Sequence, residues 1–255
     1  MKIAVCVKAV PDAAAGRRID EASKRLDRSG ELVLSDFDSH AVEEALRVRE
    51  AAGEGEVVVV SMGPERAADA VRKTLAMGAD RSVLVTDDAL AGGDLLVTAR
   101  ALAGALEREG ADLVLFGQQS ADGDGACLWA AVGELLRRPV VSQVSELQVE
   151  PGAVTGKRQT EFGYERVRAP LPAVVAVSDA INEPRYPSLK GIMGAKAKPQ
   201  EKLGAGDVGG AGESRTVVLA LAPPPARGES RRVEDGSAAD AAEAILEFLA
   251  EKRVL

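Results

Sequence analysis

Apolar segments alternate with amphipathic ones through the first half of the chain, and this alternation restricts the possible folds. Four nearly apolar segments are predicted strands: Lys2–Lys8, Glu56–Ser61, Ser82–Thr86 and Asp112–Gly117. Four amphipathic segments are predicted helices: His40–Ala52, Glu65–Met77, Asp94–Glu109 and Asp124–Arg138. Strands that lack polar alternation suit a parallel sheet that helices cover on both faces. We therefore predict an α/β fold with an open, doubly wound, Rossmann-like and mostly parallel sheet.

The pattern changes after Arg138, where shorter strands and turn residues follow. The predicted strands here are Val140–Glu150, Ala153–Glu161, Ala173–Val177 and Thr216–Leu221. Gly204–Glu213 is rich in Gly and Ala and is predicted to be flexible, and the prolines at 223–225 stiffen the chain. Ser237–Lys252 is a predicted helix that Ser237 can cap. We predict a core over residues 1–200 and a linker with a C-terminal arm over 201–255, which packs on its own core or reaches a partner subunit.

The composition argues against several classes of protein. The net charge of −8 disfavours nucleic acid as the main partner, because phosphate binding relies on clustered Lys and Arg. With His40 as the single histidine, a His-rich metal site is excluded. Cys6 and Cys127 stand outside any CxxC motif and are expected to be reduced and buried. No export signal or membrane span is recognised, so we expect a cytoplasmic protein.

Three loops follow predicted strands, where ligands collect in open α/β sheets. They are Ala9–Asp12, Ser61–Pro64 and Gly117–Gly125. The third is the most informative, since its three glycines allow a ligand close to the backbone and a helix start follows it. It lacks the Gly-Lys-Ser/Thr of a phosphate-binding P-loop. Asp124 is a ligand-binding residue or a helix cap, and a polar site of nucleotide size is predicted here.

Acid–base chemistry finds no support in the sequence. No spaced metal ligands, nucleophile motif or paired carboxylates stand out, and Glu43 and Glu44 are predicted to lie on a solvated helix face. These features favour a binding or carrier protein over an enzyme.

The segment Glu183–Pro199 is unusually basic for an acidic chain. Its four cationic side chains are Arg185, Lys190, Lys196 and Lys198. Leu189, Ile192 and Met193 stand at i, i+3 and i+4, so one helical turn would present all three on one side. Pro187 suits the entry to such a turn. From the residues alone the segment is either a linker, which is the favoured interpretation, or a surface that a partner grasps, which the apolar turn supports.

Several motifs occur together in one order. The longest is LPAVVAVSDAINEPRYPSLKGIMGAKAKP, residues 171–199. The others are VCVKAVPD at 5–12, DFDSHAVEEALRVRE at 36–50, VSMGP at 60–64, LAMGADR at 75–81 and GQQSADGDG at 117–125. Over nearly its full length the chain resembles the beta subunit of electron transfer flavoprotein, whose fold is like that of the adenine nucleotide alpha hydrolases.

The resemblance implies a heterodimer in which the alpha subunit holds most of a flavin adenine dinucleotide (FAD) and beta closes over it. The beta subunit usually binds adenosine monophosphate (AMP) in its core and is an electron carrier subunit without enzymatic activity of its own. Electrons pass from dehydrogenases, such as the acyl-CoA dehydrogenases of fatty acid β-oxidation, to a membrane quinone oxidoreductase. These properties are expectations for this chain.

The resemblance also assigns residues. The nucleotide-site residues that it implies are Cys6, Ser35, Asp36, Phe37, Asp38, Met62, Gly117, Gln118, Gln119, Ser120, Asp122, Gly123, Asp124, Gly125, Ala126, Cys127 and Leu128. Among these, Phe37 matches the position that touches the alpha-bound flavin. The implied recognition loop for the dehydrogenase is Arg185, Tyr186, Pro187, Ser188, Leu189, Lys190, Gly191, Ile192 and Met193, in which Leu189 is the anchor and the basic side chains steer the partner.

Other interpretations remain open. A branch of the family binds a second FAD in place of AMP and bifurcates electrons, and DGDGA at 122–126 is close to that branch's DGDTA. A nucleotide hydrolase or ligase of similar fold would need a P-loop or a metal-binding carboxylate pair. A stress-type nucleotide-binding module would be shorter and would lack residues 171–199.

Overall fold

The computed structural model describes residues 1–12, 14, 16, 18–222, 232 and 236–254. The chain forms two compact units, Met1–Val218 and Leu219–Leu255. The first unit contains the sheet and the loops discussed above. The prolines at 223–225 lie outside the described residues.

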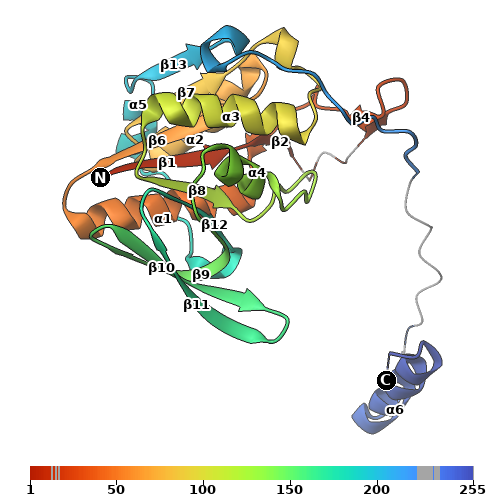
Figure 1. The fold of residues 1–255 in the computed structure, drawn as a ribbon. Helices are drawn as coiled ribbons and strands as arrows, with labels where there is room; N and C mark the ends of the chain where they lie inside the picture. Colours follow the sequence, from red (N-terminus) through yellow and green to blue (C-terminus); the bar gives the residue numbers. More distant parts are fainter. Residues whose placement is uncertain (13, 15, 17, 223–231, 233–235, 255) are drawn as a thin grey trace. The chain divides into compact units, whose positions relative to one another are not determined.

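A nine-stranded sheet forms the centre of the first unit, in the order β11-β10-β9-β12-β8-β1-β6-β7-β13 (Figure 1). Its strands are β1 Lys2–Val7, β6 Glu56–Met62, β7 Arg81–Val85, β8 Leu113–Gly117, β9 Val140–Glu150, β10 Ala153–Thr160, β11 Gly163–Pro170, β12 Ala173–Val177 and β13 Gln200–Leu203. Neighbouring strands from β9 through to β13 are parallel, and β10 is antiparallel to β9 and β11. The predicted fold class is confirmed.

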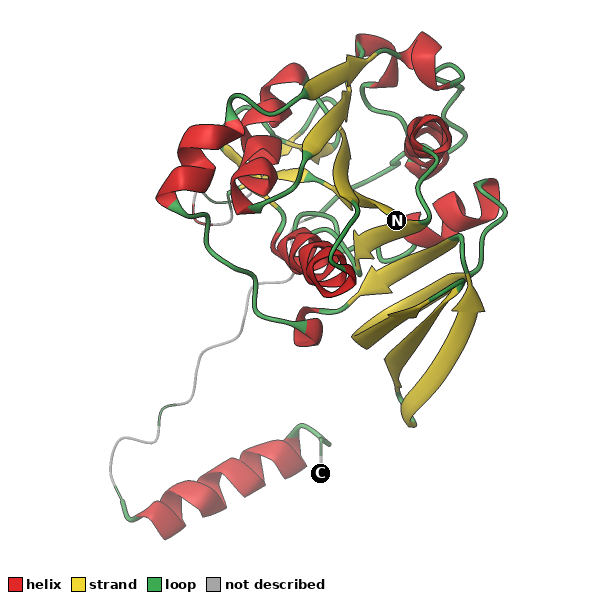
Figure 2. Ribbon diagram, turned by 90° about the vertical axis from the view of Figure 1, so that its left-hand side faces the viewer, coloured by secondary structure: helices red, strands yellow, loops and turns green. Residues whose placement is uncertain are grey.

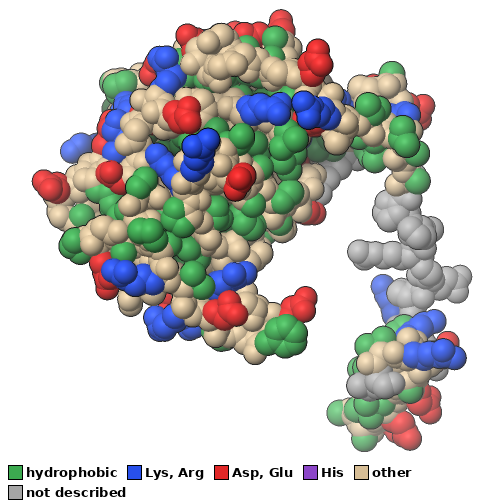
Figure 3. Space-filling view, viewed as in Figure 1, with side chains coloured by type: hydrophobic (Ala, Val, Ile, Leu, Met, Phe, Trp, Pro, Cys, Tyr) green, Lys and Arg blue, Asp and Glu red, His purple; other side chains and the backbone are tan. Residues whose placement is uncertain are grey.

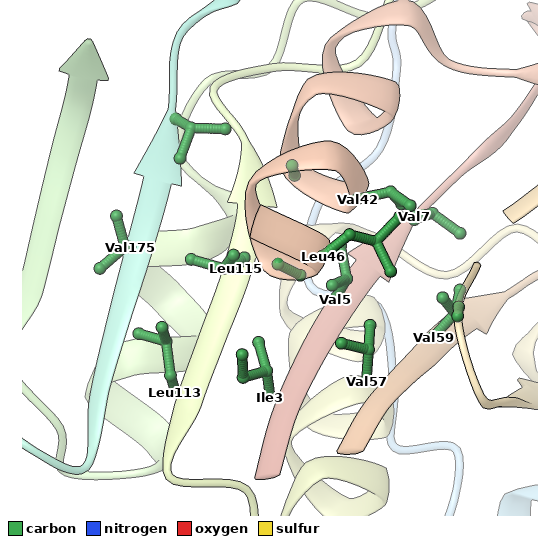
Figure 4. Close-up of a cluster of buried hydrophobic side chains, with 14 of the residues drawn as sticks. Ile3, Val5, Val7, Val42, Leu46, Val57, Val59, Leu113, Leu115 and Val175 are labelled. Carbon is green, nitrogen blue, oxygen red and sulfur yellow. The ribbon is translucent and has the colours of Figure 1, made fainter. Parts of the chain in front are cut away.

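Helices cover both faces of the sheet (Figure 2). The helices of the first unit are α1 Asp36–Ala52, α2 Ala68–Met77, α3 Leu95–Glu109, α4 Leu128–Leu135 and α5 Leu189–Ala195. One core cluster joins α1, α2 and α5 to one face, and a second joins α3 and α4 to the other. Alternate residues of β1 enter the two clusters: Ile3 and Val5 enter the first with Leu46 of α1 (Figure 4), whereas Ala4 and Cys6 enter the second. Burial on both faces explains the continuous apolar strands.

Short elements complete the first unit. Two small antiparallel pairs join β2 Ala9–Pro11 with β5 Leu32–Leu34, and β3 Ile19–Asp20 with β4 Arg25–Leu26. Single turns of 3₁₀-helix occur at η2 Glu65–Ala67, η3 Asp88–Leu90, η4 Asp179–Ile181 and η5 Ala205–Val208. The predicted helix Glu65–Met77 is therefore a 3₁₀ turn that continues as α2.

The strands β9, β10 and β11 extend the sheet as an antiparallel meander. The prediction contained β9 and β10 but missed β11, in which every residue except Val167 and Ala169 is exposed. Figure 3 shows cationic and anionic side chains mixed along this hairpin and hydrophobic atoms at its tip, where Phe162 is 98% exposed. Antiparallel sheets tolerate a solvated face, so this extension needs no covering helix.

Residues 201–208 are ordered where the sequence indicated a linker. Gln200–Leu203 forms β13, which pairs with β7 at the sheet edge, and Leu203 is its buried residue. The turn η5 that follows buries Ala205 and Val208 against the α3 face of the sheet. Thr216–Leu221, predicted to be a strand, has no strand assigned to it.

The second unit contains α6 Ala238–Glu251, close to the predicted helix. The Ser237 side chain accepts a hydrogen bond from the Asp240 backbone N–H, and the Asp240 carboxylate accepts one from the Ser237 N–H. This capping box confirms the predicted cap. Ile245, Leu246 and Phe248 remain 40–57% exposed on this helix.

The packing of η5 on α3 predicts the effect of a substitution at Gly104. A Cβ at Gly104 would overlap the backbone carbonyl of Val208, which cannot rotate away as a side chain could. We expect Gly104→Ala to destabilise the chain by about 1–3 kcal/mol, the usual cost of overpacking. The measurement is urea denaturation of the full chain. Gly206→Ala is the matched control, since a Cβ there meets nothing within 4 Å, and equal stability of the two variants would contradict the packing of η5.

Candidate functional site

A cavity of about 350 Å³ opens at the carboxyl ends of β1 and β8. These strands are neighbours, but the chain leaves β1 for β6 and β7 on one side and returns to β8 on the other. Their junction is thus the topological switch point, where open α/β sheets bind ligands. The position of the cavity follows from strand order and not from any one motif.

Twelve residues assigned from the resemblance surround this cavity. They are Cys6, Asp38, Met62, Gly117, Gln118, Gln119, Ser120, Gly123, Gly125, Ala126, Cys127 and Leu128. The lining also contains residues that sequence reasoning missed: Val7, Lys8, Leu95, Thr98, Leu102, Phe116 and Trp129. Leu95, Thr98 and Leu102 come from one side of α3, at a helical spacing that predicts core packing and gives no sign of a ligand site.

The remaining assigned residues lie outside the lining of the cavity. Ser35 is buried, and its hydroxyl accepts a hydrogen bond from the Ala121 N–H at 3.3 Å, which joins two loops. Asp36 is exposed in the first turn of α1, and Phe37 beside it is half-buried. Because α1 begins at Asp36, these residues belong to the helix and not to the loop expected before it.

Asp124 is not a helix cap. The helix α4 begins at Leu128 after Cys127, and residues 124–127 form a loop that ends in a turn, not the expected helical start. The Asp124 carboxylate accepts a hydrogen bond from the Gln119 side-chain amide at 3.3 Å. Its backbone φ of +47° lies in the left-handed region, which Asp adopts more readily than most residues. Asp124 therefore shapes the loop before α4, and the predicted alternative that it caps this helix is wrong.

Asp38 presents a buried carboxyl group at the wall of the cavity. Its Oδ2 accepts a hydrogen bond from the Lys8 backbone N–H at 2.8 Å. Burial raises the pKa of Asp38 to about 7, and the nearby Asp122 charge adds to this, against the backbone hydrogen bonds and Lys8. A Cβ at Gly117 would lie 2.7 Å from Asp38 Oδ1, so glycine lets α1 approach the end of β8. This carboxyl can donate a proton or accept a hydrogen bond near neutral pH.

The pKa of Asp122, on the adjoining loop, is lowered, whereas that of Asp38 is raised. Its side chain is 2% exposed, and burial alone would raise its pKa. The Lys8 ammonium at 2.8 Å and the Arg28 guanidinium overcome that effect and hold the pKa at about 2. Asp122 is therefore an ionised anchor that ties the cavity loop to β1 and to the segment after β4.

The aromatic and thiol groups of the cavity are held in different ways. Trp129, the single tryptophan of the chain, donates its indole N–H to the Gln118 carbonyl oxygen at 2.9 Å. Cys6 is buried, and burial raises the pKa of its thiol well above the usual value, so it stays neutral. Cys127 is exposed, contrary to the expectation that both cysteines are buried.

The docking segment, residues 183–199, contains the predicted helical turn. Helix α5 begins at Leu189, and the Ser188 hydroxyl caps it by accepting a hydrogen bond from the Gly191 N–H at 3.0 Å. Leu189, Ile192 and Met193 are 75%, 54% and 74% exposed. With Tyr186 at 91%, they form an apolar surface of the kind that marks an interaction site.

Glu43 and Glu44 do not lie on a solvated face, and that prediction is wrong. They are 3% and 7% exposed. Glu43 forms ion pairs with Arg47 and Arg185, which lower the pKa of its carboxyl despite burial. Burial raises the pKa of Glu44, which accepts a hydrogen bond from the Asn182 side-chain amide at 3.0 Å.

Two negative findings apply to the described ranges only. They contain no cluster of three or more side chains suited to a metal ion. They also contain no helix that is long and apolar enough to cross a membrane.

The raised pKa of Asp38 predicts a pH dependence of stability. The folded chain keeps this proton up to about pH 7, whereas an unfolded aspartate releases it near its ordinary pKa of about 3.9. The contribution of Asp38 to stability should therefore fall as pH rises from about 4 to about 7, by up to about 4 kcal/mol. Urea denaturation of the parent and of Asp38→Asn across this range measures it, and the variant should lose this part of the decline.

The control for this titration is Asp36→Asn, an exposed carboxylate in the same turn of α1. It should retain the pH profile of the parent chain. Parallel profiles for the parent and Asp38→Asn would contradict the assignment of the proton to Asp38.

Known proteins match this chain over most of its length. A family model described as "Electron transfer flavoprotein domain" matches residues 24–208. Electron transfer flavoprotein subunit beta of Mycobacterium tuberculosis (strain ATCC 25618 / H37Rv) is 38% identical over 265 residues, covering 99% of each chain. The subunit beta of Thermoanaerobacterium thermosaccharolyticum is 41% identical over 204 residues, covering 80% of this chain and 78% of that one.

A further relative is described as part of a larger assembly. Subunit CarD of the caffeyl-CoA reductase-Etf complex of Acetobacterium woodii is 34% identical over 263 residues and covers 100% of both chains. The match extends over the cavity, the docking segment and the ends of the chain alike. The chain therefore belongs to the electron transfer flavoprotein family, among its beta subunits.

Proposed function

We propose that this chain is the beta subunit of a heterodimeric electron transfer flavoprotein. In this proposal an alpha subunit holds most of the FAD, and the beta chain closes over it and docks the electron donor. The donor is a dehydrogenase, such as an acyl-CoA dehydrogenase, and the acceptor is a quinone oxidoreductase or a comparable protein. The observation that carries the proposal is the exposed apolar surface of α5 beside a full-length match to the family's beta subunits.

The cavity at the switch point is suited to AMP. Its volume of about 350 Å³ lies at the small end of the range for small-molecule pockets. Gly117, Gly123 and Gly125 line it and allow a close approach of the base and ribose to the backbone. The backbone N–H groups at the start of α4 and the Lys8 ammonium are suited to the phosphate. AMP bound there supplies no chemistry, and its role is structural.

The chain's own residues would orient this ligand. The Asp38 carboxyl, held by the Lys8 N–H, can exchange a hydrogen bond with a ligand hydroxyl or amine in either protonation state near neutral pH. The Asp122 carboxylate keeps the loop in place through Lys8 and Arg28. Electron transfer itself belongs to the flavin of the heterodimer, and Phe37 is the residue proposed to contact it.

A second candidate function is electron bifurcation with a second FAD in the beta chain. The sequence DGDGA at 122–126 favours it, through the likeness to DGDTA described above. The small cavity favours AMP instead, because a dinucleotide needs more room than a mononucleotide. AMP is therefore the preferred ligand.

Mass spectrometry of the nucleotides released from the purified heterodimer tests this choice. We expect AMP and FAD in a ratio of one to one. Two FAD per heterodimer without AMP would support bifurcation and contradict the structural AMP. Absence of both from a purified complex with alpha would contradict the carrier function.

The exposed Leu189 predicts a specific kinetic defect. Burying a leucine at an interface contributes about 1.5–3 kcal/mol, so Leu189→Ala should weaken docking of the dehydrogenase by about tenfold or more. The flavin spectrum should not change, because Leu189 is 75% exposed and lies outside the cavity. Stopped-flow measurement of flavin reduction checks this. Leu189→Met, which conserves volume, should retain most of the rate, and unchanged kinetics in Leu189→Ala would refute docking through α5.

A further inference from the structure

Two of the four cations in the docking segment are used inside the molecule. Arg185 and Lys198 lie on either side of α5, and both make hydrogen bonds to the body of the first unit. Lys190 and Lys196 lie between them in the sequence and have no ion pair among the described residues. The family resemblance implied the same role, steering a partner, for all four cations.

Arg185 binds two carboxylates of α1 at once. Its Nε donates to Glu43 Oε2 at 2.7 Å and its Nη2 to Glu43 Oε1 at 3.1 Å. Its Nη1 and Nη2 reach the Glu50 carboxylate at 2.6 and 3.0 Å. The Arg185 backbone N–H also donates to Glu43 Oε2, at 3.1 Å. Two-point contacts of this kind fix direction as well as distance.

The neighbouring residues strengthen this attachment. Asn182 donates from its side-chain amide to the His40 carbonyl oxygen and to Glu44 Oε2, both at 3.0 Å. Its own carbonyl oxygen lies 2.9 Å from His40 Nδ1. Burial of the Glu43 and Glu44 carboxyl groups of α1 would destabilise the fold if they had no hydrogen-bond partners. Because Arg185 and Asn182 supply those partners, the folded state favours keeping the docking segment against α1.

The other end of α5 is attached to α2. Lys198 donates from Nζ to the Leu75 and Ala79 carbonyl oxygens, at 2.9 and 2.6 Å, where it satisfies carbonyls near the end of that helix. A Cβ at Gly191 would overlap the Ala76 carbonyl oxygen, so glycine allows α5 to lie against α2. Ala195 of α5 is 1% exposed in the core cluster that contains α2.

We propose that Arg185 and Lys198 are positioning residues that hold α5 in its docking orientation before any partner arrives. The Glu43 and Glu50 carboxylates of α1 bind Arg185, and the carbonyl oxygens at the end of α2 bind Lys198. Ordering α5 in advance removes a conformational cost that would otherwise be paid on binding. This inference rests on the proposed docking function, and it names which residues prepare the surface for the partner.

Hydrogen–deuterium exchange of the heterodimer tests the attachment without any electron donor. Arg185→Gln should accelerate exchange of the amides in residues 186–197 by about tenfold, which corresponds to a loss of about 1.4 kcal/mol of local stability. Lys190→Gln is the matched control, since it removes the same charge from the same segment. Its exchange should equal that of the parent, and equal exchange in all three proteins would overturn the proposal.

The dependence of flavin reduction on donor concentration distinguishes a positioning role of Arg185 from electrostatic steering of the partner. In Arg185→Gln the donor concentration for half-maximal flavin reduction should rise, while the limiting rate stays the same, because a docked α5 is unchanged once it is bound. Arg185→Lys should restore only part of the affinity, since a lysine cannot contact both carboxylates through a planar fork. An equal rise for Lys190→Gln and Arg185→Gln, without faster exchange, would show steering and overturn positioning.

A milder variant guards against loss of folding. Glu50→Gln removes the exposed ion pair of Arg185 with Glu50 and leaves the ion pair of Arg185 with the buried Glu43 intact. This variant should accelerate amide exchange in residues 186–197 and weaken the affinity for the donor, each by a smaller factor than Arg185→Gln does. If Leu189→Ala leaves transfer unchanged, the docking function fails, and the exchange data alone still decide whether Arg185 holds α5.

Discussion

Burial of the central strands on both faces is the constraint on which the rest of the first unit depends. Strands β1, β6 and β8 are almost wholly inaccessible to solvent, so α1 and α2 must cover one face and α3 and α4 the other. Neither solvent nor a ligand can reach side chains in the middle of these strands. Function is therefore confined to the strand ends, where the cavity lies, and to segments laid over the covering helices, such as α5.

Helix α1 connects these two functional regions. Its first turns contain Asp38 at the cavity wall, and the following turns contain Glu43 and Glu50, which bind Arg185 of the docking segment. Gly117 allows the start of the helix to sit against the end of β8. A single rigid helix thus fixes the cavity and the docking surface relative to each other.

The sequence predicted the features that depend on local pattern. Apolar runs gave the parallel strands, and the spacing of Leu189, Ile192 and Met193 gave α5. Glu43 was misjudged because its partner Arg185 stands 142 residues away and nothing nearby indicates burial. Strand β13 was missed because an edge strand buries little, here only Leu203. The cavity position was predicted from strand ends, but the contribution of α3 required the tertiary packing of Leu95, Thr98 and Leu102.

The central claim is that this chain closes over a flavin held by another subunit. The most direct test is the visible absorption spectrum of the chain purified alone and after co-expression with an alpha subunit. The account predicts a colourless chain alone and a yellow complex that elutes as a heterodimer. A chain that binds flavin or hydrolyses ATP alone, or that stays monomeric beside every alpha subunit tried, would contradict it.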